Sequence, residues 1–403
     1  MSTSMSREIT LIVKVTNACN MACRYCFIEP SVFHKTMVSD TAKRVIRVFL
    51  DSDWFKSVNF VWHGGEPLLR GQRFFEDIIR EQQRLPTRVA YTNSIQTNAT
   101  LLDDALLAFL LQNDIAIGLS MDGPQALNDS ARPMRKGPPV SAHEITLNAA
   151  DRLRAHGQAP AAIVVINRAN VNHPEQVYRE FKERAIDMKL NPLAKSGLAA
   201  TEGAAMDITA EQYGAFMVRI FDAWFDDPEP AIYIEPIRQH IARILGVPGV
   251  VHACHFSKSC HRSFLGIAPD GEIYPCGMFQ GEPAFRYGNI HSMSPENVAT
   301  TALFGRIEDR EARVLAGCSK CAFLDLCYSG CMFHSLKNGG LFEEKDYYCA
   351  GYKVYFEHVL RRIHSDLRRA SGRVDSSDTP LRSQEKRIGG AQTRPSATPR
   401  GTR

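Results

Sequence analysis

Three cysteines within eight residues constrain this chain more than any other feature of its sequence. Cys19, Cys23 and Cys26 form the pattern C-x3-C-x2-C directly behind an apolar stretch, 9–15, that is typical of a buried strand. Three thiolates on one short loop can hold three irons of a four-iron cluster, which leaves the fourth iron open to an outside ligand. The alternative is a zinc site, which usually takes cysteine pairs from two places and requires a fourth ligand.

The triplet, the strand before it and Phe27 after it resemble the signature loop of the radical S-adenosylmethionine (SAM) superfamily. In that family the amino and carboxylate groups of SAM chelate the open iron. One electron from the cluster cleaves SAM to a 5′-deoxyadenosyl radical, which takes a hydrogen atom from an unactivated carbon of the substrate. The resemblance implies a SAM-binding 4Fe-4S cluster on Cys19, Cys23 and Cys26.

The other eight of the eleven cysteines lie in the C-terminal part of the chain, and none occurs between 27 and 253. The odd total and this distribution argue against a disulfide framework. Eight thiolates are the number that two fully ligated four-iron clusters require, although two structural zinc sites would need the same number. The eight are Cys254, Cys260, Cys276, Cys318, Cys321, Cys327, Cys331 and Cys349.

Apolar strand-like stretches alternate with segments of helical periodicity over the first half of the chain. This alternation predicts an α/β fold, in which a parallel sheet curls into a partial (β/α)6 barrel resembling a TIM barrel. The functional loops of such a barrel gather at the C-terminal ends of the strands. Strands are expected at 9–15, 58–63, 88–96, 115–121, 161–167 and 188–193, and helices at 40–50, 74–83, 103–111, 142–155 and 174–184.

A Gly-Gly-Glu-Pro run follows the second expected strand. Gly64 and Gly65 allow the backbone to approach a ligand, and Glu66 or nearby carbonyl groups can accept hydrogen bonds from an ammonium group. Such a run is often only a turn, but its place one β/α unit after the cysteine loop resembles the family's motif for the amino group of SAM. The same resemblance assigns Ser120 and Arg132 to SAM, and 96–98 and 120–124 to the ribose and substrate segments.

The second cysteine region contains a strong hairpin signal, Asp270-Gly271, between two short strand-like runs. A β-ribbon there is expected to present Cys276 beside Cys260. The whole array resembles the SPASM extension of radical SAM peptide-modifying enzymes, which holds two closed auxiliary 4Fe-4S clusters. The resemblance implies that the nearer cluster is bound by Cys254, Cys260, Cys276 and Cys331, and the farther one by Cys318, Cys321, Cys327 and Cys349.

Five parts are expected along the chain. They are a radical SAM partial barrel, a linker with bridging helices at 210–225 and 232–245, a SPASM-type domain, a C-terminal helix and a basic tail. The tail has almost nothing apolar to bury, so it is expected to be disordered. The parts span 1–196, 197–249, 250–352, 353–370 and 371–403.

Composition limits the classes of protein to which the chain can belong. No run of about eighteen apolar residues occurs, and the polar N-terminus leads at once into a strand, so neither a membrane span nor a signal peptide is expected. A cytoplasmic protein is therefore predicted. The net charge of +4 is small for this length and comes largely from the tail, which argues against nucleic-acid binding.

Gly277 is informative about the substrate. Sulfatase maturases, which oxidise a Cys or Ser to formylglycine, resemble this chain in nearly all cysteine spacings but carry an Asp, the proposed base, directly after the cysteine matching Cys276. Because glycine cannot accept a proton, formylglycine formation here would need another acceptor, such as Asp122 or Tyr25. We therefore expect a maturase that abstracts a hydrogen atom from a ribosomally made precursor peptide and installs a cross-link, either a cyclophane-type carbon-carbon bond or a thioether.

Two other functions stay open: a sulfatase maturase, and a non-catalytic iron-sulfur or zinc-binding protein. A cysteine triplet without a fourth partner argues against the second. The expected partners are a precursor peptide and an external electron donor such as flavodoxin or ferredoxin. Because the first strand begins near residue 9, no room is expected for a leader-binding domain before it, so a separate leader-binding protein is a further candidate partner.

Overall fold

Ten strands form one sheet in this computed structural model, in the order β10-β9-β8-β1-β2-β3-β4-β5-β6-β7. The structure describes residues 4–136, 140–201, 205–250 and 254–371. Strands β1 to β6 are neighbours in sequence and in space, and all pair in parallel, which confirms the expected partial barrel. They are β1 (Glu8–Thr16), β2 (Ser57–Gly64), β3 (Ala90–Gln96), β4 (Ile115–Ser120), β5 (Ala161–Ile166) and β6 (Asp187–Pro192).

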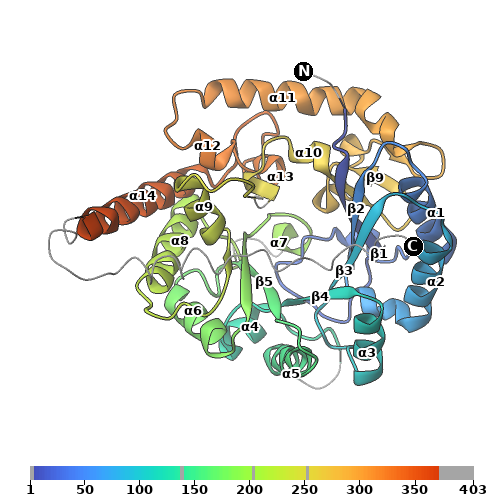
Figure 1. Cartoon of the computed structure of the whole chain (residues 1–403), viewed down its shortest axis with the longest axis horizontal. Helices are drawn as coiled ribbons and strands as arrows, with labels where there is room; N and C mark the ends of the chain where they lie inside the picture. The colour runs from blue at the N-terminus through green and yellow to red at the C-terminus, as the bar shows by residue number, and fades with distance from the viewer. Residues whose placement is uncertain (1–3, 137–139, 202–204, 251–253, 372–403) are drawn as a thin grey trace.

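Helices surround the curved sheet on its outer side (Figure 1). Alternate residues of β1, namely Leu11, Val13 and Val15, are fully buried and belong to the same core as the apolar stripes of the helices. The five helices expected in this half are present, with ends that differ by up to three residues. They are α1 (Ser39–Leu50), α2 (Gly71–Arg84), α3 (Asp104–Gln112), α5 (Ala142–Ala155) and α6 (Pro174–Glu183).

The C-terminal cysteine region adds strands to the barrel sheet itself. The expected hairpin forms from β8 (Phe264–Ile267) and β9 (Glu272–Tyr274), and β10 (Gly288–Asn289) pairs with β9. Strand β8 also pairs in parallel with β1, with Phe264 opposite Thr10. The ribbon therefore continues the barrel sheet, and it brings Cys276 to the edge of β1.

The prediction of a helix at 232–245 is wrong for its first turn. Residues Ile234–Glu235 form β7, which pairs with β6 through Met188, and α9 begins only at Ile237. Ile234 is fully buried, so pairing with a strand distant in sequence prevails over local helical periodicity. The bridging helix at 210–225 is confirmed as α8 (Ala210–Phe225).

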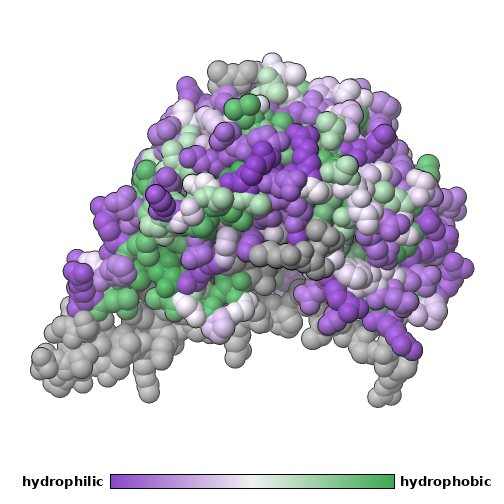
Figure 2. Space-filling model, turned by 90° about the horizontal axis from the view of Figure 1, so that it is seen from above, coloured by the Kyte–Doolittle hydropathy of each residue, from purple (hydrophilic) through white to green (hydrophobic). Residues whose placement is uncertain are grey.

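Two longer helical segments were not expected, namely α4 (Gln125–Ala131) and α11 (Ala302–Gly317). Helix α11 runs along one side of the molecule, at the top of Figure 1, and hydrophilic residues gather at the centre of the face seen from that side (Figure 2). Its inner stripe includes Phe304, Ile307 and Val314, which are buried. The remaining helices are α7 (Leu198–Thr201), α9 (Ile237–Ile244), α10 (Cys260–Ser263), α12 (Leu324–Cys327), α13 (Met332–Lys337) and α14 (Cys349–Ser371).

Helix α14 begins four residues before the expected start at 353. The tail expected from 371 lies, from 372 onward, outside the described residues. None of the described helices is long and apolar enough to cross a membrane. The five-part division of the chain stays a prediction.

Candidate active site

The cysteine triplet follows the C-terminal end of β1 and is held by segments distant in sequence. The backbone N–H of Cys26 donates to the carbonyl of Cys23 at 3.0 Å, which closes the loop. The N–H groups of Ala22 and Arg24 donate to carbonyls of the segment 131–133 at 2.8 and 2.9 Å. This segment begins at the last residue of α4, so the unexpected helix positions the loop.

The three thiols of this loop are largely buried. Burial is the main cause that raises the pKa of Cys19 to about 11 and that of Cys23 to about 12, and the positive charge of Arg132 opposes it. Cys19 Sγ also accepts hydrogen bonds from Met21 N at 3.4 Å and from Asn98 Nδ2 at 3.7 Å. Sulfur atoms that accept N–H groups beside a buried cation fit the thiolate ligands of a cluster.

The Gly-Gly turn after β2 lies directly against the start of the cysteine loop. Gly65 N donates to Thr16 O at 2.8 Å, and Glu66 N donates to Ala18 O at 2.9 Å. A Cβ at Gly64 would lie 1.9 Å from Thr16 O, and one at Gly65 would lie 2.3 Å from Ala18 O. Only glycine permits this approach, which couples the turn to the loop.

Glu66 is fully buried, and its carboxylate is already hydrogen-bonded. Its Oε1 accepts from Leu68 N at 2.9 Å and from Thr97 Oγ1 at 2.8 Å, and its Oε2 accepts from Asn98 N at 2.8 Å. Burial raises the pKa of Glu66 to about 7, which these three donors oppose. The side chain therefore ties the turn after β2 to the end of β3. This geometry favours the carbonyl groups of the turn as acceptors for an ammonium group.

We expect Glu66→Ala to weaken SAM binding by about tenfold or more. The substitution leaves three buried donors without an acceptor, at roughly 1–3 kcal/mol each, and so releases the turn. Glu66→Gln keeps one acceptor oxygen and should lose less. Equilibrium binding of SAM to the anaerobically reconstituted protein measures both, and wild-type affinity in Glu66→Ala would contradict the expectation.

A chain of buried polar side chains lies beside the triplet. Arg132 Nη1 donates to Tyr25 Oη at 2.6 Å, and Tyr25 Oη donates to Asp122 Oδ2 at 2.5 Å. Asp122 Oδ1 accepts the N–H of Val165 at 2.9 Å, so both sequence-predicted proton acceptors are engaged with protein partners. Arg132 Nε is buried and has no hydrogen-bond partner in the described part of the chain. This orphan N–H fits an anionic ligand such as the carboxylate of SAM.

The C-terminal ends of β3 and β4 meet beside these buried polar side chains. Gln96 Nε2 donates to Ser120 Oγ at 2.9 Å and to Leu119 O at 2.6 Å. A Cβ at Gly118 would lie 2.6 Å from Gln96 Oε1, so glycine leaves the space that the glutamine side chain fills. The two segments expected to bind the ribose and the substrate are therefore in contact.

Four cysteines from four segments converge beside β1, as the resemblance implies for the nearer cluster. They are Cys254, Cys260, Cys276 and Cys331. Burial is the main cause that raises the pKa of Cys260 and of Cys331 well above the ordinary value of a thiol. The neighbouring thiols of this set add to the effect, as does Asp346 for Cys331. The hydroxyl of Tyr287 is buried near two of these thiols and has no hydrogen-bond partner among the described residues. An unpaired donor beside these thiols fits a bound group whose sulfur atoms accept hydrogen bonds.

The other four cysteines line one cavity of about 80 Å³ at the start of α14. Lys345 and Lys353 line the same cavity, and both oppose the effect of burial, which raises the pKa of Cys349. Four thiols around one cavity, with two cations beside them, fit a second fully ligated cluster. These thiols belong to Cys318, Cys321, Cys327 and Cys349.

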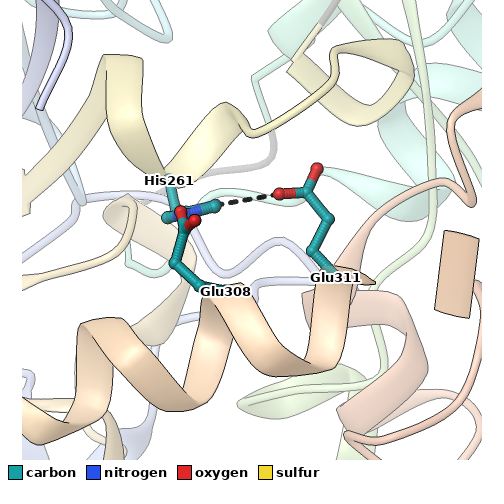
Figure 3. Close-up of side chains that lie close together, drawn as sticks. All are labelled: His261, Glu308 and Glu311. Carbon is teal, nitrogen blue, oxygen red and sulfur yellow. Dashed lines mark hydrogen bonds and ion pairs between the residues drawn. The ribbon is translucent and has the colours of Figure 1, made fainter. Parts of the chain in front are cut away.

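A histidine of α10 and two glutamates of α11 connect these two helices. His261 lies between Glu308 and Glu311 (Figure 3), with 3.9 Å between its Nδ1 and Glu311 Oε2, and its Nε2 contacts Glu308. Glu311 accepts hydrogen bonds from Ser259 N at 2.6 Å and Oγ at 2.8 Å, and Glu308 pairs with Arg262. These carboxylates are therefore already bonded to residues that precede and follow Cys260 in the sequence. The contacts hold the segment of Cys260 against α11.

Two residues in the barrel interior were not identified from the sequence. Lys14 on β1 is buried, and His63 lies opposite it on β2. The available signal was a lysine within the apolar stretch 9–15, where a charge is unexpected.

Comparison with known proteins agrees with this arrangement. The family model of the radical SAM superfamily matches residues 13–181, and that of the SPASM iron-sulfur cluster-binding domain matches residues 249–322. The chain is 29% identical over 386 residues to the serine-type anaerobic sulfatase-maturating enzyme of Bacteroides thetaiotaomicron, covering 88% of this chain and 90% of the relative. It is 27% identical over 372 residues to the cysteine-type anaerobic sulfatase-maturating enzyme of Clostridium perfringens, covering 88% and 97%.

Solved structures share the fold. The structure described as native anSMEcpe with bound AdoMet superposes with a TM-score of 0.77 at 24% identity, covering 89% of this chain and 98% of that one. Streptococcus suis SuiB bound to precursor peptide SuiA superposes with a TM-score of 0.61 at 17% identity, covering 85% and 76%. The two domain matches, together with the cysteine sets described above, identify the chain as a radical SAM enzyme with a SPASM domain, whose cofactors are SAM and 4Fe-4S clusters.

Proposed function

We propose that this enzyme oxidises a side chain within a peptide or protein substrate. The observation that carries the proposal is the convergence of two cysteine sets on β1. The triplet follows its C-terminal end, and the pairing of β8 with β1 brings Cys276 to its edge. A substrate radical formed near the first set would thus have an electron acceptor close by, as a net two-electron oxidation requires.

The residues that would hold SAM are those gathered at the carboxyl ends of β1 to β4. The carbonyl groups of the Gly64-Gly65 turn would accept from its ammonium group, and Arg132 would pair with its carboxylate. Ser120, whose hydroxyl accepts a hydrogen bond from Gln96 Nε2, would be a further contact. Bound there, SAM and the clusters supply hydrogen-atom abstraction and the removal of one further electron. The protein contributes an enclosed barrel interior, which keeps water and other hydrogen donors away from the radical.

The relatives favour formylglycine as the product. Sulfatase-maturating enzymes of both the serine and the cysteine type match nearly the whole chain, which supports the function that was the alternative in the sequence analysis. For serine, the oxidation removes one hydrogen atom, one proton and one electron from the CH₂OH group and leaves an aldehyde. The proton needs an acceptor, for which Asp122 and Tyr25 stay the candidates.

Gly277 favours a second candidate, a cross-link within a precursor peptide. A Cβ at Gly277 would lie 2.6 Å from Ile12 Cγ2 on β1, so the aspartate that sulfatase maturases carry there would require the side chain of Ile12 or the loop to shift. A bond from a carbon radical to an aromatic ring does not need a thiol or hydroxyl deprotonated beforehand. Like the cross-link itself, a flavodoxin or ferredoxin donor and a separate leader-binding protein remain proposals.

A peptide assay distinguishes the two products. The reconstituted protein is reduced with dithionite and given SAM with either a serine-containing sulfatase peptide or a candidate precursor peptide from a neighbouring gene. Loss of two hydrogen atoms together with hydrazide reactivity identifies an aldehyde, and hence formylglycine. The same mass loss without hydrazide reactivity identifies a cross-link. Formation of 5′-deoxyadenosine with every tested peptide unaltered would contradict both products.

A further inference from the structure

Lys14 is a buried basic side chain in the interior of the barrel. It lies near the C-terminal end of β1 and is only 1% exposed. Among the described residues, no carboxylate pairs with its ammonium group and no acceptor hydrogen-bonds it. An isolated ammonium group costs several kcal/mol to bury, so a negative charge is needed nearby.

One side of Lys14 faces the loop of the SAM-binding cluster. Phe27 directly follows Cys26, and its ring centroid lies 4.7 Å from Lys14 Nζ. His63 is opposite Lys14 in the strand register, with its ring 6.4 Å from that of Phe27. Burial, reinforced by the charge of Lys14, lowers the pKa of His63 to about 4, so the imidazole is neutral at pH 7 and adds no second positive charge beside Lys14.

The same face of β1 reaches the nearer auxiliary set. Ile12 lies two residues before Lys14, on the same face of the strand, and contacts the position of Gly277, which directly follows Cys276. Burial lowers the pKa of Lys14 to about 8, and the thiols of Cys26 and Cys276 oppose this effect. As thiolate ligands of clusters, both cysteines would therefore place negative charge near this ammonium group.

We propose that Lys14 is the shared counter-cation of the SAM-binding cluster and the nearer auxiliary cluster, and that its charge raises the reduction potentials of both. A fixed positive charge in a low-dielectric interior stabilises the more negative, reduced form of each cluster. The inference rests on the assignment of these cysteines to clusters, but not on which peptide product forms. The farther set has cations of its own, Lys345 and Lys353.

This role would serve both halves of the proposed oxidation. A raised potential makes the SAM-binding cluster easier to reduce by an external donor. At the nearer cluster it favours acceptance of the electron that the substrate radical must lose. Lys14 is thus a tuning residue, since neither function requires it to touch the substrate.

The test is a redox titration of the reconstituted full chain, monitored by electron paramagnetic resonance. Lys14→Met removes the charge but keeps a long, unbranched side chain. We expect the potentials of the SAM-binding and nearer clusters to become more negative, while the farther cluster keeps its potential and the iron content stays at the wild-type level. Addition of SAM identifies the first cluster, because only its signal should change. Lys56→Met removes an exposed lysine and should shift no potential.

A second neutral variant, Lys14→Gln, separates charge from packing, since both neutral variants should shift the same two potentials in the same direction. Unchanged potentials in both variants would overturn the proposal. Unchanged potentials with weaker peptide binding would also overturn it, and would assign Lys14 to the substrate instead. Because the titration needs no peptide, a failure of the proposed peptide oxidation would not affect its outcome.

Discussion

Cys23→Ala is expected to abolish the formation of 5′-deoxyadenosine from SAM and to leave the auxiliary clusters in place. Cys23 is the central residue of the triplet, and its thiol is buried beside the positive charge of Arg132. The two auxiliary sets take no cysteine from this loop. Iron should therefore fall from about twelve to about eight atoms per chain. Iron and sulfide analysis, with chromatographic detection of 5′-deoxyadenosine after reduction by dithionite, measures both effects.

Cys276→Ala is the matched control for this experiment. It removes one cysteine of the nearer set and is expected to lower the iron content by a similar amount, because that cluster loses a ligand. Cleavage of SAM should persist, since the triplet is intact. Zinc in place of iron in the wild type, or SAM cleavage by Cys23→Ala at the wild-type rate, would contradict the assignment.

Arg132→Ala is expected to weaken SAM binding ten- to a hundredfold. The buried Nε of Arg132 is the orphan donor that fits the carboxylate of SAM, and a charge-assisted hydrogen bond of this kind contributes about 1.5–3 kcal/mol. The substitution also deprives the buried pair of Tyr25 and Asp122 of its cation. Equilibrium SAM binding, with iron content measured alongside, tests the expectation.

Two further variants serve as controls for the SAM affinity of Arg132→Ala. Arg132→Lys keeps the charge but cannot donate from two positions at once, so it should lie between the wild type and Arg132→Ala. Arg73→Ala removes an exposed arginine from α2 and should leave SAM affinity unchanged. If Arg132→Ala bound SAM as tightly as Arg73→Ala, another residue would have to hold the carboxylate.

The chemical class of the protein was readable from the sequence because its signals are local. Three thiols on one loop restrict the ligands that can bind there, whatever the rest of the chain does. The period of apolar residues identified six strands and five of the helices between them, since burial on one face imposes that period. The hairpin at Asp270-Gly271 was readable for the same reason, because its turn is specified by two adjacent residues.

Contacts between distant segments were decided by the tertiary structure alone. The pairing of β8 with β1, which brings Cys276 to the barrel, joins residues more than two hundred and fifty positions apart. Arg132 and Tyr25, separated by 107 positions, meet because α4 places the segment 131–133 on the cysteine loop. No local pattern encodes such partners, since they depend on how whole elements pack.

The hydrogen-bonding state of each polar side chain is likewise not encoded in a local pattern. Glu66 was readable as a polar residue in a ligand-binding turn, but only the fold shows that backbone and side-chain donors already occupy its carboxylate. Lys14 was readable only as an unexpected charge in an apolar strand, and the fold shows that it lacks an anionic partner among the described residues. Sequence therefore determined which chemical groups are present, whereas tertiary packing decided which of them remain free to bind, because burial and hydrogen bonding depend on neighbours from the whole chain.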